Sequence, residues 1–499
     1  MPARPSGFPT EGPAPELVEA GFALESADAP FLHRGLNLAD IAHVVDLSSR
    51  DIIPDDATRA LLGVLLQTEQ TEASEFPYDP AFGEPYNSRE HYFVGLLGDV
   101  AGWLHAGRPR REAARIALRL HLRNQLVDLV EEAARFCAAV ADIAEEHAST
   151  LMPDQTYLQQ AQPSTFGHYI VSFAYPTARD GRRLLEALDW VNQSPGGAGC
   201  VNGSRLLEDR GVIASLLGFD GVIENTRDAM WQTDGLIDTL ATAASLISNQ
   251  SKLAEDLEIW SSSEFDFVDL AGPFTRASVL MPQKRNPYAL SIVRGAAGVL
   301  IGRLTGFLAV VKSPSARSDN LIFAYGEVPR ALDLTLRITR LMTGVVSTLT
   351  VNAERMWEEL IGGFSQATDL AEYVMGKCGI DYRTAYVVVG HTVRAAAQAG
   401  LRGVDITGEM IDAAAVDHTG QQLGLAGADL SPVLDPRQIV LTRRAAGGAA
   451  PSAIESMVAS CRKAASDLSA EASRRRSRFQ TAEADLLRTA RALAGEEKT

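Results

Sequence analysis

Apolar residues recur every three or four positions along much of this chain, which is the spacing of one face of an α-helix. Between residues 111 and 145 this pattern runs without Pro or Gly, and it predicts a helix long enough to cross a whole domain. The same spacing predicts long helices over residues 228–255 and 288–311. The last of these carries small residues, including Gly295 and Gly298, that let two helix backbones approach closely.

Alternating runs bounded by hairpin turns are few, so the pattern predicts an all-α fold. A bundle buries one apolar face of each long helix, and the apolar surface that remains suggests burial against other subunits. We expect four parts along the chain: an unstructured lead-in over 1–30, an N-terminal helical domain over 31–111, a central bundle over 112–362 and a C-terminal helical domain over 363–499. The polar helix expected from about Ala465 onward reads as a solvated face.

The formal net charge of −17 argues against a nucleic-acid partner, because binding a polyanion needs a clustered basic face. A few local arginines can still hold a small anionic substrate. No apolar run reads as a membrane span, and the Pro- and Gly-rich start lacks the features of a secretory signal. Four scattered cysteines without CxxC spacing read as free thiols in a reducing cytosol, so we expect a cytoplasmic protein without a membrane partner.

The segment over residues 277–287, ASVLMPQKRNP, carries the chemistry. A base that removes a proton beside a carboxylate needs positively charged or hydrogen-bond-donating neighbours, since the carbanion adds a second negative charge to that carboxylate. The lysine and amide of this segment can stabilise that charge. A serine hydroxyl is a poor base unless such neighbours stabilise its alkoxide. The segment taken by itself is equally compatible with a simple turn.

The segment resembles the GSSxMPxKxNP signature of the fumarase/aspartase superfamily, and its MPQKRNP form is closest to argininosuccinate lyase. Four further segments resemble family motifs in the family order: 98–110 (GDIAGKLHTGRSR in the family), 156–163 (THLQRAQP), 194–210 (SPLGSGA…DR) and 363–371 (GFSTATDLA). The resemblance covers about residues 40–468.

This resemblance implies three helical domains, a homotetramer built on the central bundle, and active sites each drawn from three subunits. It implies a small dicarboxylate substrate and no metal or organic cofactor. Ser278 falls on the catalytic-base serine, and Lys284 and Asn286 fall on the residues that stabilise the aci-carboxylate intermediate. The resemblance also implies a substrate-binding role for four residues in the motif segments: Arg110, Thr156, Gln159 and Met281.

The family residues that protonate the leaving group are missing from this sequence. The family histidine that protonates the leaving group is replaced by Tyr157, and the glutamate that pairs with it is replaced by Ser291. A leaving group that is stable as an anion needs little or no proton. Alternatively, the Tyr157 phenol supplies the proton.

The expected substrate pocket also differs in charge. Arg111, Arg205 and Arg317 stand where the family has other residues, and a family arginine is replaced by Thr233. Guanidinium groups attract a carboxylate, nitro or nitronate group and repel a guanidinium leaving group. Any one of these arginines can also face solvent or another chain.

Three functions follow. The first is a lyase that forms fumarate from a substituted succinate with an acidic leaving group. The most specific version of this hypothesis is the splitting of nitrosuccinate to fumarate and nitrite. We expect such an enzyme to belong to secondary metabolism. The second is elimination from an N-substituted aspartate such as argininosuccinate, with Tyr157 as acid. The third is a catalytically silent homologue kept for structure, against which the retained Ser278, Lys284 and Asn286 argue.

Overall fold

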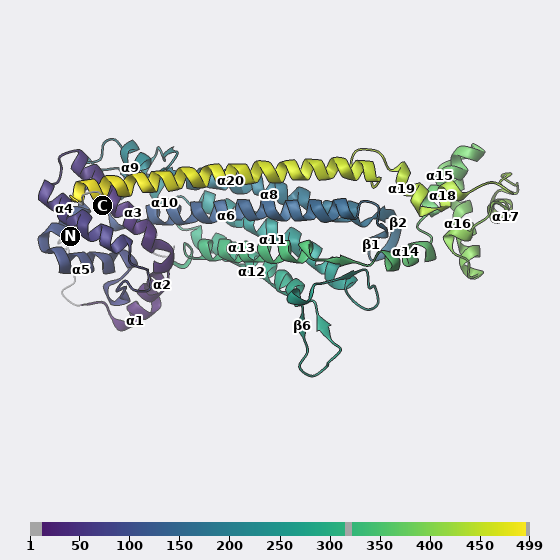
Figure 1. Cartoon of the computed structure of the whole chain (residues 1–499), viewed down its shortest axis with the longest axis horizontal. Coiled ribbons are helices and arrows are strands. Elements are labelled where there is room, and N and C mark those ends of the chain that lie inside the picture. Colours follow the sequence, from purple (N-terminus) through teal and green to yellow (C-terminus); the bar gives the residue numbers. More distant parts are fainter. Residues whose placement is uncertain (1–11, 315–321, 496–499) are drawn as a thin grey trace, which may run out of the picture.

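The protein is an elongated assembly of α-helices in which a central bundle joins two smaller helical regions (Figure 1). The computed structural model describes residues 12–314 and 322–495. The central bundle contains the long helices, which are α6 (Arg110–Glu146), α8 (Ala174–Val191), α11 (Asp234–Trp260), α12 (Tyr288–Val311), α13 (Glu327–Ser347) and α20 (Pro451–Ala494). This architecture confirms the predicted all-α fold.

The two end regions are built from shorter helices. The N-terminal region contains α1 (Pro15–Leu17), α2 (Ala23–Ser26), α3 (Ala29–Ser49), α4 (Asp55–Glu69) and α5 (Pro85–Leu97). The C-terminal region contains α14 (Ala353–Gly362), α15 (Ala367–Cys378), α16 (Tyr382–Gln398), α17 (Gly408–Thr419), α18 (Ser431–Leu434) and α19 (Pro436–Thr442). Three more short helices lie in the connections, namely α7 (Phe166–Val171), α9 (Gly211–Leu216) and α10 (Thr226–Trp231).

Strands in the described residues are short and occur in pairs. The longest pair is the antiparallel hairpin of β1 (Leu151–Thr156) and β2 (Gln159–Thr165). The others are parallel β3 (Gln193–Ser194) with β4 (Gly221–Val222), and antiparallel β5 (Val268–Asp269) with β8 (Thr350–Val351) and β6 (Arg276–Ala277) with β7 (Arg285–Asn286). These pairs fasten loops to the helices rather than forming a sheet layer.

Each of the three regions has an apolar cluster of its own. The central cluster includes Leu126, Leu246 and Leu290, the N-terminal one includes Leu62, and the C-terminal one includes Leu370. The expected boundaries at 31, 112 and 363 stay a prediction, but two details of that division differ from the packing. Residues 15–26 form helical turns instead of an unstructured lead-in. Helix α20 packs along α6 and places Ile454 and other apolar residues in the central cluster, so it belongs to the bundle.

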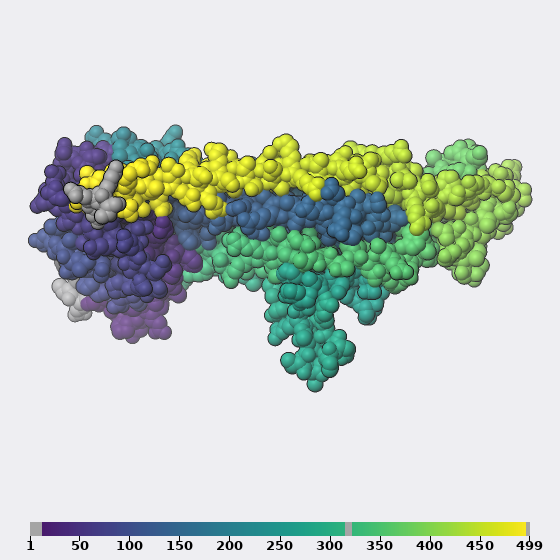
Figure 2. All heavy atoms as spheres, viewed as in Figure 1, coloured from purple at the N-terminus to yellow at the C-terminus, as the bar shows by residue number. Residues whose placement is uncertain are grey.

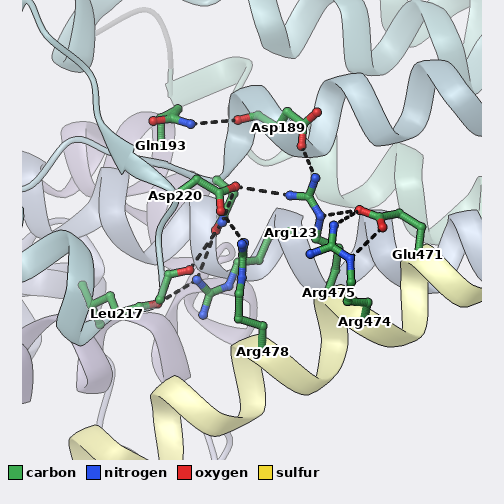
Figure 3. A network of polar contacts seen from close by, with 11 residues as sticks. Arg123, Asp189, Gln193, Leu217, Asp220, Glu471, Arg474, Arg475 and Arg478 are labelled. Carbon is green, nitrogen blue, oxygen red and sulfur yellow. Dashed lines mark hydrogen bonds and ion pairs between the residues drawn. The ribbon is translucent and has the colours of Figure 1, made fainter.

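The polar side of α20 is also not simply solvated. Figure 3 shows arginines of this helix turned toward acidic residues of other elements. Arg475 pairs with Asp189 at 2.6 Å, and Arg478 pairs with Asp220 at 2.5 Å. Arg476 pairs with Asp128 of α6 at 2.7 Å. The basic run therefore fastens α20 to α6, α8 and the loop before β4, because its charges are neutralised there.

Helix α12 is unusually apolar for its length. Within the described ranges it is the single helix long and apolar enough, by length and composition, to cross a membrane. It nevertheless packs in the bundle, where it contacts α11 and α13 and buries Leu290 and Val293. Only 28% of its most apolar stretch is buried within this chain, so the helix leaves an apolar face uncovered.

Candidate active site

The loop that carries Ser278 projects from the flank of the bundle (Figure 2). Strands β6 and β7 pair at its base, with Arg276 opposite Asn286. At its start, the Ser278 hydroxyl oxygen accepts hydrogen bonds from the backbone N–H groups of Leu280 at 3.3 Å and Met281 at 3.0 Å. Donors aimed at this oxygen favour its deprotonated form, so the turn is suited to a serine that acts as a base.

The remaining polar groups of this loop are anchored at its base or open to solvent. The Asn286 amide donates to the Arg276 carbonyl at 2.9 Å, and Arg285 donates to Asp269 at 2.9 Å. Lys284 and Met281 are exposed. Val279 and Leu280 at the tip are almost fully exposed, at 109% and 82%. The loop therefore has a fixed base and a tip whose Val279 and Leu280 side chains are left almost fully exposed.

Thr156, Tyr157 and Gln159 lie together at the tip of the β1–β2 hairpin. Thr156 faces Gln159 across a two-residue turn made of Tyr157 and Leu158, whose φ angles are +56° and +59°. Two-residue hairpin turns with both φ angles positive are normally made by Asn and Gly, because larger side chains are strained there. The turn leaves the Tyr157 side chain 99% exposed. Strained backbone of this kind concentrates at functional sites.

Arg110 and Arg111 begin helix α6. The Arg110 guanidinium pairs with Glu84 at 2.5 Å, and Arg111 lines a cavity between the N-terminal helices and α13. Arg205 is exposed, and its neighbour Ser204 lies close to Gly107, just before α6. A Cβ placed on Gly107 would be only 2.5 Å from the Ser204 hydroxyl oxygen. The structure therefore groups these three arginines at one end of the bundle. Arg317 lies outside the described residues.

The cavity beside Arg111 is not purely basic. It is lined by Glu25, Asp28 and Glu84 as well as by Arg111 and Arg115. Arg115 stacks on the Tyr325 ring at 3.8 Å. Reasoning from the sequence missed these three carboxylates, because they do not belong to a recognisable motif and only folding brings them beside α6. Their charge offsets the gain of arginine that the sequence showed.

Ser291, on α12, stands where the family glutamate is expected. Its hydroxyl donates to Glu258 of α11 at 2.9 Å, and Arg294 pairs with the other oxygen of Glu258 at 2.5 Å. A carboxylate therefore still lies beside this position, although it comes from a different helix and is already held by two partners. Within residues 12–314 and 322–495, His, Cys, Asp and Glu side chains form no group of three or more that could hold a metal ion.

One chain keeps its three groups of site residues apart. Helix α6 has 37 residues, and at the usual rise per residue it is about 55 Å long. Arg110 begins this helix, whereas the hairpin with Tyr157 follows its far end (Figure 1). The Ser278 loop leaves the bundle between these ends. A small dicarboxylate cannot span such a distance, so a site that uses all three groups needs more than one chain.

A bundle of long helices with Ser278, Lys284 and Asn286 on one projecting loop fits the class that the sequence motifs resemble, the helical lyases. The comparisons agree with that class. A family model described as lyase matches residues 78–302, and one described as argininosuccinate lyase C-terminal matches residues 364–441. The chain belongs to the fumarase/aspartase superfamily, on the branch close to argininosuccinate lyase, and it is a fumarate-releasing carbon–nitrogen lyase.

Individual relatives cover nearly the whole chain. The argininosuccinate lyase of Methanococcoides burtonii is 35% identical over 85% of this chain and 86% of its own length. The argininosuccinate lyase 2 of Shouchella clausii is 32% identical over 82% and 87%. A crystal structure of EDDS lyase in complex with formate superimposes with a TM-score of 0.86 at 29% identity, and covers 97% of both chains.

Proposed function

We propose that this protein removes a proton from a substituted succinate with Ser278 and releases fumarate. The observation that carries the proposal is the turn at Ser278, where two backbone N–H groups point at the hydroxyl oxygen. Lys284 and Asn286 of the same loop would hold the carboxylate as it gains its second negative charge. Arg110, Thr156 and Gln159 would bind the carboxylates of the substrate, and Met281 would pack against it.

We also propose a homotetramer, because it brings the three groups of site residues together. Helix α12 supplies the surface, since its uncovered face carries Ile292, Val299, Ile301 and Leu308, which are 39–52% exposed. The glycines of this helix have open space around them, so another helix can approach closely. Burial of such a face between subunits is a strong favourable term.

The leaving group we propose is one that departs as an anion, with nitrosuccinate as the specific substrate. The reaction would break the carbon–nitrogen bond of nitrosuccinate, and the electron pair would leave on nitrite. Position 157 holds a tyrosine that is 99% exposed and makes no side-chain hydrogen bond or ion pair with the described residues, and position 291 holds a serine already bound to Glu258. Neither arrangement resembles a histidine–glutamate pair that delivers a proton, so the reaction should proceed without one.

An N-substituted aspartate is the second candidate, and one observation favours it. Glu25, Asp28 and Glu84 give the cavity beside Arg111 an acidic side suited to a positively charged amine or guanidinium group, although Asp28 and Glu84 also pair with Arg330 and Arg110. The relatives described above are argininosuccinate lyases and EDDS lyase, which fits this second candidate. In this case Tyr157 would donate the proton to the leaving nitrogen.

Incubation of the purified protein with single substrates separates these functions. Nitrosuccinate, argininosuccinate, ethylenediamine disuccinate, aspartate and adenylosuccinate would each be supplied alone, and fumarate would be measured with time. Ser278→Ala serves as the control for background elimination. Fumarate and nitrite from nitrosuccinate in equal amounts are the expected result. Fumarate from an aspartate derivative alone would replace the first candidate by the second, and no fumarate from any of them would favour the silent homologue.

A further inference from the structure

A buried glutamate joins the start of α6 to the glycine-rich segment 194–199. Glu112 follows Arg110 and Arg111 directly, and its side chain is completely buried. One carboxylate oxygen accepts the backbone N–H of Gly197, and the other accepts that of Gly199, both at 2.7 Å. These are short bonds to a charged acceptor, which makes them among the stronger contacts of a protein.

Backbone geometry of the segment makes this contact possible. Gly197 and Gly199 have φ angles of +71° and +61°, which favour glycine, and this conformation presents both N–H groups to one carboxylate. The segment is also held from its other side, because Arg210 donates to the Gly196 carbonyl at 2.9 Å. The Ser194 hydroxyl accepts the Gly196 N–H at 3.1 Å. The Glu112 carboxylate thus binds this segment directly to the first turn of α6.

We infer that Glu112 is a positioning residue of the active site: its ionised carboxylate holds segment 194–199 against the first turn of α6, and so fixes Arg110 and Arg111 for the substrate carboxylate. The inference rests on the proposed function, because it assumes that these arginines bind substrate. It goes beyond that function in assigning a role to a side chain that cannot itself touch the substrate.

The charge state of Glu112 makes the contact sensitive to pH. Burial raises the pKa of the Glu112 carboxyl group to about 7, against the lowering effect of the Gly197 and Gly199 hydrogen bonds and of the Arg108 and Arg210 guanidinium groups that face it. Above this pKa both oxygens accept hydrogen bonds. Below it one oxygen carries a proton and cannot accept in the same way, so the contact weakens on acidification.

The first test measures the contact itself, without any turnover. Amide hydrogen exchange of segment 194–199 would be compared between wild type, Glu112→Gln and Glu112→Asp, with the intrinsic pH dependence of exchange removed. We expect exchange in Glu112→Gln to be at least about tenfold faster than in wild type at pH 8 and independent of pH between about 6 and 8. Glu112→Asp keeps the charge and should lie between them. Equal exchange in all three would overturn the inference.

The second test measures how the Glu112 contact affects ligand binding and turnover. Fumarate binding would be measured by calorimetry, and KM and kcat on whichever substrate is turned over. The matched control is Glu132→Gln, another buried glutamate of α6, which bonds Thr343 and Arg135 away from this region. We expect Glu112→Gln to weaken fumarate binding and raise KM about tenfold while kcat changes less than about threefold. The control should change neither.

The outcomes separate the two proposals. A wild-type protein that binds no fumarate contradicts the proposed function and removes the basis of this inference as well. A wild-type protein that binds fumarate, with Glu112→Gln binding equally well, contradicts only the inference. A loss of kcat without a change in KM would also overturn it, because a misplaced carboxylate-binding arginine acts first on binding.

Discussion

The start of α6 and the Ser278 loop differ in how firmly the rest of the chain holds them. At the start of α6, Glu112 is fully buried and bonded to two backbone N–H groups, and Arg110 is paired with Glu84. At the Ser278 loop, only the base is anchored, and the tip residues Val279 and Leu280 stand in solvent. The start of α6 is therefore held by contacts within a single chain, whereas the tip of the Ser278 loop is left exposed by that chain.

This contrast explains why the chain can keep its catalytic groups so far apart. Substrate-binding residues need a rigid, buried support, because that support keeps their side chains in the geometry that binds the substrate. An exposed loop can close over a substrate and exclude water, at the cost of little stabilisation of its own. Substitutions in the loop should therefore act on catalysis with little effect on stability.

Ser278→Ala should have the largest effect. Removing the base should lower the rate of fumarate formation by about a thousandfold or more, while the free energy of unfolding changes by no more than about 0.5 kcal/mol, because the loop is exposed. Progress curves of fumarate formation and urea denaturation check the two halves of this prediction. A variant that retains more than about a tenth of wild-type activity would contradict the role of Ser278.

Arg110→Met should act on binding. A charged hydrogen bond to a carboxylate is worth about 1.5–3 kcal/mol, so KM should rise about 10- to 100-fold with a smaller change in kcat. Loss of the half-exposed pair with Glu84 should cost no more than about 1 kcal/mol in unfolding free energy. Arg337→Met, which removes an exposed pair with Asp333 on α13, is the matched control and should change neither KM nor kcat.

Leu158→Gly tests the strained hairpin. Glycine tolerates the positive φ of this turn, so the variant should be more stable than wild type by about 1 kcal/mol in thermal or urea denaturation. The same change at Leu24, an exposed position within helix α2, should instead destabilise by about 1 kcal/mol. If Leu158→Gly also destabilises, the turn is not strained and its two positive φ angles need another explanation.

Tyr157→Phe should have the smallest effect. If the leaving group departs as an anion, loss of the phenol hydroxyl should change kcat less than about twofold on nitrosuccinate, since no proton is needed. Measurement of kcat at several pH values checks this without ambiguity from substrate binding. A fall of a hundredfold or more would identify Tyr157 as the acid and favour the N-substituted aspartate.

Much of the fold could be predicted from the sequence, because the long helices carry unbroken apolar periodicity. The structure places α6 at Arg110–Glu146 and α12 at Tyr288–Val311, close to or at the predicted bounds. The place of α20 could not be predicted, since its partners on α6 and α8 lie hundreds of residues away in the chain. The helical turns of residues 15–26 were missed because the Pro- and Gly-rich stretch before them, residues 1–15, favoured an unstructured start that was extended too far.

The site was predicted unevenly for a related reason. Ser278, Lys284 and Asn286 belong to one contiguous motif, so their proximity follows from the sequence. Folding brings Glu84 to Arg110 and brings Gly197 and Gly199 to Glu112, and a sequence motif gives no direct sign of either contact. For Glu112 a weak signal existed, because an acidic residue in the first turn of a helix often accepts backbone N–H groups there.

Mixing two impaired variants tests the central claim, that one active site combines Ser278 and Arg110 from different chains. Ser278→Ala and Arg110→Ala would be expressed separately and then co-expressed in equal amounts, and activity would be measured at a substrate concentration well below the wild-type KM, where both parents should be strongly impaired. Random assembly should restore about one quarter of the wild-type activity, because each contributing chain has an even chance of carrying the intact residue. Activity no greater than the mean of the two separately measured parents would contradict the account, since both residues would then act within a single chain.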